Sequence, residues 1–161
     1  MTDLHKARWL ALLVPAALLA GAYGSQIWGG LYPCEMCWWQ RYPHFAAVGL
    51  ALVAFLARAP GTVRILVLLA ALAILTSGAI GVYHAGVEWG IFEGVTHCTA
   101  GGRAGVSNAD LLADIMATPL VRCDEVQWSF LGLSLAGWNA LISIGAAVVI
   151  LWLSLKKTKT A

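Results

Sequence analysis

The stretch ILVLLAALAILTSGAIGVYHAGV, residues 65–87, has no charged residue and lies between Arg64 and Glu88. A helix needs about 20 consecutive apolar residues to cross the hydrocarbon core of a bilayer. The stretch therefore predicts a membrane-spanning helix, and it decides the class of fold.

Three further uncharged stretches cover residues 9–34, 42–57 and 126–155. The second is short, but its flanking arginines can extend to the headgroups and the bilayer can thin around it. The sequence thus predicts an all-α membrane protein, a four-transmembrane-helix bundle, as a single integral membrane domain over residues 1–161. The approximate spans are residues 9–30, 42–58, 65–87 and 128–155.

The composition agrees with this class and excludes others. Hydrophobic residues make up 60% of the 161 residues and charged residues 11%, whereas soluble domains have about 25% charged residues. An ordinary soluble enzyme could not bury so much apolar surface, and a disordered chain would contain far less of it. The net charge of +2 is too small to indicate a nucleic-acid partner, so membrane lipid is the expected surrounding.

The lysines and arginines predict the orientation, because the cytoplasmic side of a membrane protein is enriched in them. Seven of them fall on one side of the predicted spans and three on the other. Both termini are therefore expected in the cytoplasm, with residues 31–42 and 88–129 outside. Lys6, Arg8 and the sequence Ala20-Gly21-Ala22 also resemble a cleavable signal peptide. We favour an uncleaved first helix, because the uncharged run continues beyond Ala22.

All four cysteines fall in the predicted outer segments. Cys34 and Cys37 form a C-x-x-C in the first, and Cys98 and Cys123 lie in the second. Of the three possible pairings, local spacing favours Cys34 with Cys37 and Cys98 with Cys123. We interpret the C-x-x-C as redox-active. The alternatives are a structural disulfide and half of a zinc site, which would need further ligands at close spacing.

The residues around the C-x-x-C favour a reactive thiol. Pro33 suits the first position of a helix, which would put both sulfurs near the positive end of the helix dipole. Arg41 follows Cys37 by four residues and so shares its helix face. Pro43 is expected to kink that helix, which would alter the face that Cys37 and Arg41 share.

The second outer segment predicts a short amphipathic helix that lies in the headgroup plane. Ser107 suits the cap of such a helix. Leu111, Leu112, Ile115 and Met116 would then form one apolar face. The helix would either anchor the loop or take part in docking a partner.

Two cysteine pairs on one side of a membrane suggest a relay by thiol–disulfide exchange. The relay needs a terminal acceptor, and a membrane quinone requires only an apolar cleft with one or two polar groups. Arg41 and His84 lie near predicted outer helix ends and could supply these groups. The simpler interpretation is that both side chains only reach the membrane interface.

Three segments resemble one family of membrane proteins. They are PCEMCWWQR at residues 33–41, GVYHAGVEW at 81–89 and CDEVQWSFLGL at 123–133. The order of the four cysteines among four spans is also similar. On these grounds the chain resembles the DsbB family, disulfide bond formation protein B, over essentially its whole length.

This resemblance implies a four-helix protein of the bacterial inner membrane with its redox loops in the periplasm. Such a protein reoxidises a DsbA-like thioredoxin-fold oxidase and passes the electrons to quinone, either ubiquinone or menaquinone. By the same resemblance, the partner's thiolate would attack Cys98, and Cys123 would exchange with Cys34. Cys37 would lie beside the quinone as a thiolate, and Arg41 would hold the quinone. His84 would be the polar residue that serves the quinone from the third helix, with Glu88 as the alternative.

A second class of function is a non-catalytic membrane scaffold with two structural disulfides. The scaffold hypothesis predicts that the C-x-x-C disulfide resists mild reductants and that quinone has no effect on it. A thiol:quinone oxidoreductase predicts the opposite on both points.

Overall fold

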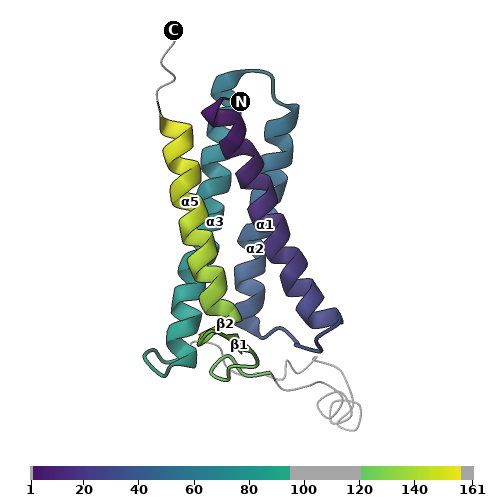
Figure 1. Ribbon diagram of the computed structural model, residues 1–161, viewed down its shortest axis with the longest axis vertical. Helices are drawn as coiled ribbons and strands as arrows, with labels where there is room; N and C mark the ends of the chain where they lie inside the picture. Colours follow the sequence, from purple (N-terminus) through teal and green to yellow (C-terminus); the bar gives the residue numbers. More distant parts are fainter. Residues whose placement is uncertain (1, 95–120, 157–161) are drawn as a thin grey trace, which may run out of the picture.

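The computed structural model describes residues 2–94 and 121–156. Within these ranges, four long helices lie side by side in one bundle (Figure 1). They are α1 (Asp3–Ile27), α2 (Glu35–Leu56), α3 (Pro60–Glu88) and α5 (Leu135–Leu155). The predicted all-α four-helix bundle is confirmed, and the amphipathic helix expected around residues 107–116 lies outside the described residues.

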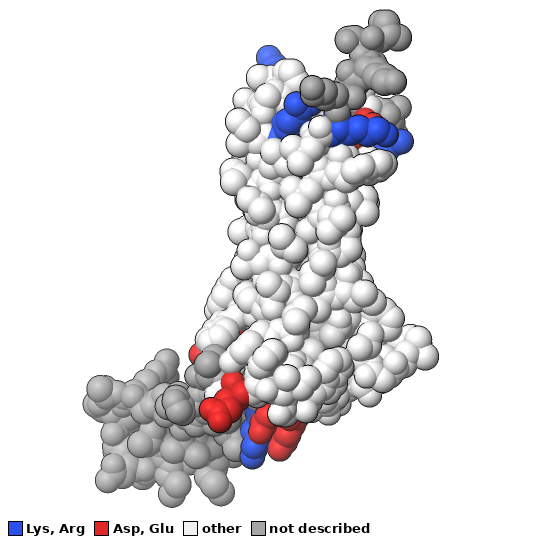
Figure 2. All heavy atoms as spheres, turned by 90° about the vertical axis from the view of Figure 1, so that its left-hand side faces the viewer, with Lys and Arg blue, Asp and Glu red and all other residues white. Residues whose placement is uncertain are grey.

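Three of the four helices, α1, α3 and α5, are long and apolar enough to cross a membrane. The shorter α2 packs against α1 and α3 within the same bundle. Large apolar side chains such as Leu13, Leu72 and Val148 point outward, as a helix surface in contact with lipid requires. Charged side chains gather at the two ends of the bundle, and the surface between them is uncharged in the view of Figure 2.

The start of α1 and the end of α5 lie at the same end of the bundle (Figure 1). Asp3 and Lys156 form an ion pair there, with 3.7 Å between carboxylate and ammonium. The connection between α2 and α3 lies at this end too. The segment before α2 and the described residues before α5 lie at the opposite end (Figure 1). The described parts of the predicted inner and outer segments therefore separate in space.

Residues 129–134 form a hairpin that precedes the last helix. Strands β1 (Ser129–Phe130) and β2 (Leu133–Ser134) pair antiparallel, with Phe130 opposite Leu133. The two residues between them, Leu131 and Gly132, both have positive φ, 52° and 79°, as a type I′ turn requires. Ser134 then caps α5 by accepting a hydrogen bond from the backbone N–H of Gly137. The helix therefore begins later than the predicted span of residues 128–155.

Small residues let α3 and α5 approach closely, as is common between membrane helices. A Cβ atom on Gly78 would lie 2.8 Å from Cγ1 of Ile144, and one on Gly81 would lie 3.0 Å from the carbonyl oxygen of Ala136. Gly49 in α2 is the opposite case, since a Cβ there would meet nothing within 4 Å.

We expect Gly78→Ala to lower the free energy of unfolding in detergent by about 1–3 kcal/mol, because the added methyl group overpacks the α3–α5 contact. Gly49→Ala is the matched control, since it gains the same helix propensity without the clash. Chemical denaturation of both variants checks this. Equal stability of the two would mean that α3 and α5 do not pack this closely.

Candidate active site

Helix α2 begins directly after the first cysteine of the C-x-x-C. Cys34 has an extended backbone, and its sulfur accepts a hydrogen bond from the backbone N–H of Cys37, with 3.3 Å between N and Sγ. The helix itself starts at Glu35, slightly later than Pro33 suggested. Cys34 thus occupies the N-cap position, where a side-chain acceptor satisfies one of the open N–H groups of the first turn.

This capping geometry brings the two sulfurs together. The Sγ atoms of Cys34 and Cys37 lie 2.8 Å apart, and both residues are thiols in this structure. The side-chain hydrogen bond with Cys37 raises the pKa of the Cys34 thiol, and burial raises it further. A negative charge on Cys34 therefore needs stabilisation from another donor nearby.

Cys123, from the second outer segment, lies beside this pair. Its sulfur, the sulfur of Cys34 and a ring nitrogen of His84 all lie within 4.8 Å of one another, and all three residues are buried. Cys98 and its expected pairing with Cys123 lie outside the described residues. The structure thus brings Cys34, Cys37, Cys123 and His84 of the predicted site into one cluster.

Arg41 is buried between α1 and α2 rather than extended to the membrane surface. Its guanidinium donates to Oε1 of Gln26 at 2.9 Å and to the carbonyl oxygen of Ala22 at 3.1 Å. The same group lies over the rings of Tyr23 and Trp38, 4.7 and 5.0 Å from their centroids. Helix α2 continues unbroken through Pro43, so Cys37 and Arg41 belong to one helix as predicted.

Glu88, the alternative to His84, belongs to the same cluster. Its carboxylate accepts a hydrogen bond from the hydroxyl of Ser134. The other carboxylate oxygen lies 3.9 Å from Nε2 of His84. His84 and Glu88 are separated by one helical turn of α3 and face the same side.

A network of polar side chains continues from this cluster into the bundle. Gln40 contacts His84, and Asn139 of α5 contacts Gln40. Asn139 also contacts His44 and Ser143. Sequence reasoning did not identify Gln40 or Asn139. Both are uncharged polar residues within or beside an apolar stretch, and this pattern could have identified them. Polar residues in membrane helices face the bundle interior and are functional more often than apolar residues.

A cavity of about 220 Å³ lies against the cluster. Its apolar wall comes from α1, with residues such as Leu18 and Gly21. Its polar wall is formed by residues of α2, α3 and α5 together with the segments that precede α2 and β1. The predicted site residues in the lining are Cys34, Cys37, Arg41 and His84, and Glu88 joins them.

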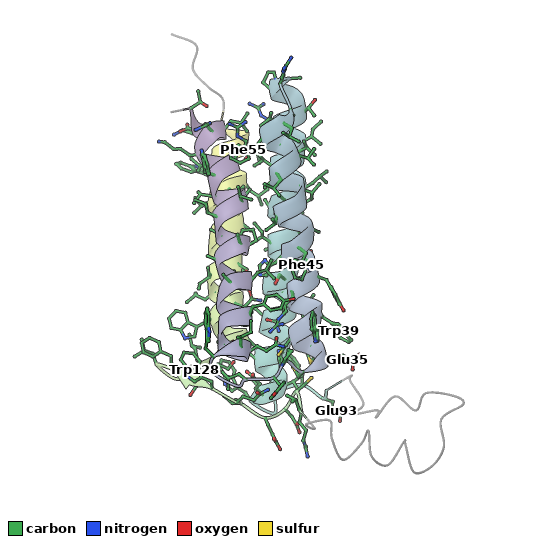
Figure 3. The ribbon with its side chains drawn as sticks, turned by 90° about the vertical axis from the view of Figure 1, so that its right-hand side faces the viewer. Glu35, Trp39, Phe45, Phe55, Glu93 and Trp128 are labelled. Carbon is green, nitrogen blue, oxygen red and sulfur yellow. The ribbon has the colours of Figure 1, made fainter. Side chains whose placement is uncertain are left out.

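Aromatic side chains surround this end of the bundle. Trp39 near the start of α2 and Trp128 just before β1 both lie there, as does Glu35 (Figure 3). Trp128 also stacks with Phe130, with 6.2 Å between ring centroids. Aromatic residues gathered at one end of a bundle are typical of a membrane interface.

Cys34, His84 and Cys123 are also residue types that bind zinc. They supply three ligand atoms, whereas structural zinc sites have four. The cysteine ligands of zinc must be thiolates, so zinc could bind here only while both cysteine pairs are reduced. The described residues thus offer one ligand fewer than a structural zinc site needs.

Comparisons with known proteins identify the family of the chain. Residues 5–153 match the family model described as "Disulfide bond formation protein DsbB". A protein from Azoarcus sp. (strain BH72) named "Disulfide bond formation protein B" is 36% identical over 145 residues, which cover 86% of this chain and 84% of the relative. A protein of the same name from Marinobacter nauticus is 35% identical and covers 83% of each chain. No solved structure matches the chain. The chain belongs to the DsbB family of disulfide bond formation proteins.

Proposed function

We propose that the cluster of Cys34, Cys37 and Cys123 is the site where this thiol:quinone oxidoreductase moves electrons from a protein partner toward membrane quinone. Membership of the DsbB family makes the chain a disulfide-forming membrane oxidoreductase that reoxidises DsbA by way of quinone. The observation that supports the site assignment is the meeting of sulfurs from both outer segments, within 4.8 Å, beside one cavity. The partner is a periplasmic DsbA-like thioredoxin-fold protein.

The cysteines act in the following order. A thiolate of the partner attacks Cys98, which breaks the Cys98–Cys123 disulfide and leaves Cys123 as a thiolate. Cys123 then attacks the sulfur of Cys34, the Cys34–Cys37 bond breaks, and Cys37 leaves as a thiolate. Each step exchanges one disulfide for another without net change in electrons. The second thiolate of the partner then closes the partner's disulfide and releases Cys98. Cys98 attacks Cys123, which re-forms the Cys98–Cys123 bond and releases Cys34, so that the Cys34–Cys37 pair holds the two electrons.

The cavity fits a quinone ring. A cavity of about 150 Å³ holds benzene, and this one measures about 220 Å³ with an apolar wall from α1. Cys37 and Arg41 line it, and so does His44, whose buried Nδ1 has no hydrogen-bond partner within the described part of the chain. Bound there, quinone would accept two electrons and two protons. Arg41 would hold the quinone oxygen by its guanidinium, and His84 belongs to the wall of the same site.

The orientation follows from charge and from position in the bundle. The end with the start of α1, the end of α5 and the α2–α3 connection has most of the described lysines and arginines, and such an end belongs on the cytoplasmic side. The cysteine cluster would then face the periplasm. We therefore propose that the chain lies in a bacterial inner membrane with both termini in the cytoplasm.

The order of exchange predicts that a Cys37→Ser variant accumulates a Cys34–Cys123 disulfide. Without Cys37, Cys34 has no partner in its own pair, and its thiolate can attack the neighbouring Cys123. This attack breaks the Cys98–Cys123 disulfide and releases Cys98 as a thiolate. Mass spectrometry of non-reduced peptides from the purified variant would detect the bond. Cys34→Ser is the matched control, in which Cys37 is left alone and a bond between Cys37 and Cys123 should be much rarer.

A scaffold with two structural disulfides predicts another result. Cys37→Ser would then keep the Cys98–Cys123 bond and leave Cys34 as a thiol. That outcome would contradict the exchange between pairs.

A further inference from the structure

The two ring nitrogens of His84 have different surroundings. Nδ1 lies 2.8 Å from Nε2 of Gln40, and Nε2 lies 3.6 Å from Sγ of Cys34. A neutral imidazole donates from one nitrogen and accepts at the other, and its partners decide which. The orientation of the Gln40 amide therefore decides which nitrogen of His84 has the hydrogen.

Two neighbours fix the Gln40 amide. Its nitrogen lies 3.2 Å from the carbonyl oxygen of Met36, which can only accept. Its oxygen accepts from the amide nitrogen of Asn139 at 2.8 Å. The amide nitrogen of Gln40 is thus the donor toward His84, and Nδ1 of His84 is the acceptor.

Asn139 is fixed in the same way. Its amide nitrogen lies 3.2 Å from the carbonyl oxygen of Ser77. Its oxygen accepts from the hydroxyl of Ser143 at 3.0 Å, and it lies 2.9 Å from Nε2 of His44. The chain from Asn139 through Gln40 to His84 therefore starts at a backbone carbonyl and has one consistent direction.

The neighbours of Nε2 among the described residues can each accept a hydrogen bond. They are the sulfur of Cys34 at 3.6 Å and a carboxylate oxygen of Glu88 at 3.9 Å. The backbone of Cys123 makes a further hydrogen bond with the His84 side chain. His84 is nearly fully buried, with 3% of its surface exposed. Its N–H is thus directed at the point where the two cysteine pairs meet.

We propose that Gln40, held by Asn139, positions His84 so that its Nε2–H stabilises the thiolate of Cys34. This thiolate is released when the two cysteine pairs exchange their disulfide. This inference rests on the proposed relay and deepens it. In that step the thiolate of Cys98, released when the partner closes its own disulfide, attacks Cys123. The Cys98–Cys123 bond forms, the Cys34–Cys123 bond breaks, and its electron pair stays on the sulfur of Cys34. No electrons enter or leave, and the negative charge moves from the attacking sulfur to Cys34. His84 thus acts on the sulfur of Cys34, and Gln40 is a positioning residue.

The first test observes the tautomer directly. In protein labelled with ¹⁵N-histidine and held in detergent, two-bond ¹⁵N–¹H spectra distinguish a hydrogen on Nε2 from one on Nδ1. The His84→Phe variant identifies the signal. We expect His84 to have its hydrogen on Nε2 in the parent, and a mixture of both tautomers in Gln40→Met, which keeps the side-chain length and removes the amide. A hydrogen on Nδ1 in the parent would overturn the proposal.

The second test separates this role from quinone binding. Gln40→Met and His84→Phe should lower kcat for partner oxidation by roughly 10- to 100-fold, the range expected for one hydrogen bond to a charged group. The fall in kcat should exceed the rise in the KM for ubiquinone, because the lost hydrogen bond faces Cys34 although both residues also line the cavity. A raised ubiquinone KM with unchanged kcat would overturn the proposal and make His84 a quinone ligand.

Ser154→Ala is the matched control. It removes a buried hydroxyl from α5 that has no hydrogen-bond partner in the described ranges and does not line the cavity. Its kcat and KM should equal those of the parent. If the parent protein reduced no quinone, the proposed function would be contradicted. The tautomer of His84 is measured in the resting protein, so it tests the role of Gln40 independently of quinone reduction.

Discussion

A Cys123→Ser variant should lose oxidation of a reduced thioredoxin-fold partner by about a thousandfold or more, the scale expected when an essential reacting group is removed. The hydroxyl of serine cannot form the bond to Cys34 through which electrons reach the C-x-x-C. The same variant should still reduce ubiquinone when a small dithiol such as dithiothreitol is supplied. Cys34 and Cys37 line the cavity, so a small thiol can reduce that pair without Cys123. Both rates can be followed by the loss of quinone absorbance.

Cys37→Ser provides the comparison, because it removes the cysteine of the C-x-x-C that the relay assigns to quinone. It should be inactive with the protein partner and with dithiothreitol alike. If Cys123→Ser oxidised the partner at the parent rate, electrons would have to enter at the C-x-x-C directly. The proximity of Cys123 and Cys34 would then have no role in the reaction.

Replacing Arg41 with methionine should raise the KM for ubiquinone by about 10- to 100-fold, since a charged hydrogen-bond donor is lost from the cavity wall. The KM for the protein partner should change little, because Arg41 lies between α1 and α2 and contacts Gln26 and Ala22. Steady-state kinetics with each substrate varied in turn gives both constants.

Arg58→Met is the control for Arg41, because it removes the same charge from the exposed connection at the other end of the bundle. Thermal unfolding of both variants separates a local loss of binding from a loss of fold. An Arg41→Met variant with the parent's dependence on quinone concentration would remove Arg41 from the quinone site.

Features that depend on residues close together in the sequence could be predicted from it. Apolar runs without charge, such as residues 65–87, predict the helices because a bilayer imposes length and composition on any span. The C-x-x-C predicts two sulfurs in one helical turn, and the structure has Cys34 and Cys37 in contact at the start of α2. The four-residue spacing of Cys37 and Arg41 likewise puts both in the first half of that helix.

The hairpin before α5 was not predicted, because residues 129–134 are uncharged and extend an apolar run. Its turn depends on the positive φ of Leu131 as well as that of Gly132, and leucine gives no such signal. The predicted span of residues 128–155 therefore includes the residues of the hairpin.

Contacts between distant residues could not be predicted either. Gln40 and Asn139 are 99 positions apart, and Arg41 and Gln26 lie on different helices. Their meeting depends on how the helices rotate and pack, which side-chain periodicity does not determine in helices that are apolar on every face. The tautomer of His84 follows from these contacts and so requires the structure.

Each dithiol oxidised should yield one quinone reduced through the cysteine cluster. The most direct measurement is quinone absorbance during turnover, with purified protein in detergent, a reduced thioredoxin-fold dithiol and ubiquinone, and with Cys37→Ser as the control. We expect one quinol for each partner disulfide formed in the parent and no quinol in the control. If the parent oxidised no dithiol with either ubiquinone or menaquinone, the relay would be contradicted and the scaffold with structural disulfides would explain the cysteines better.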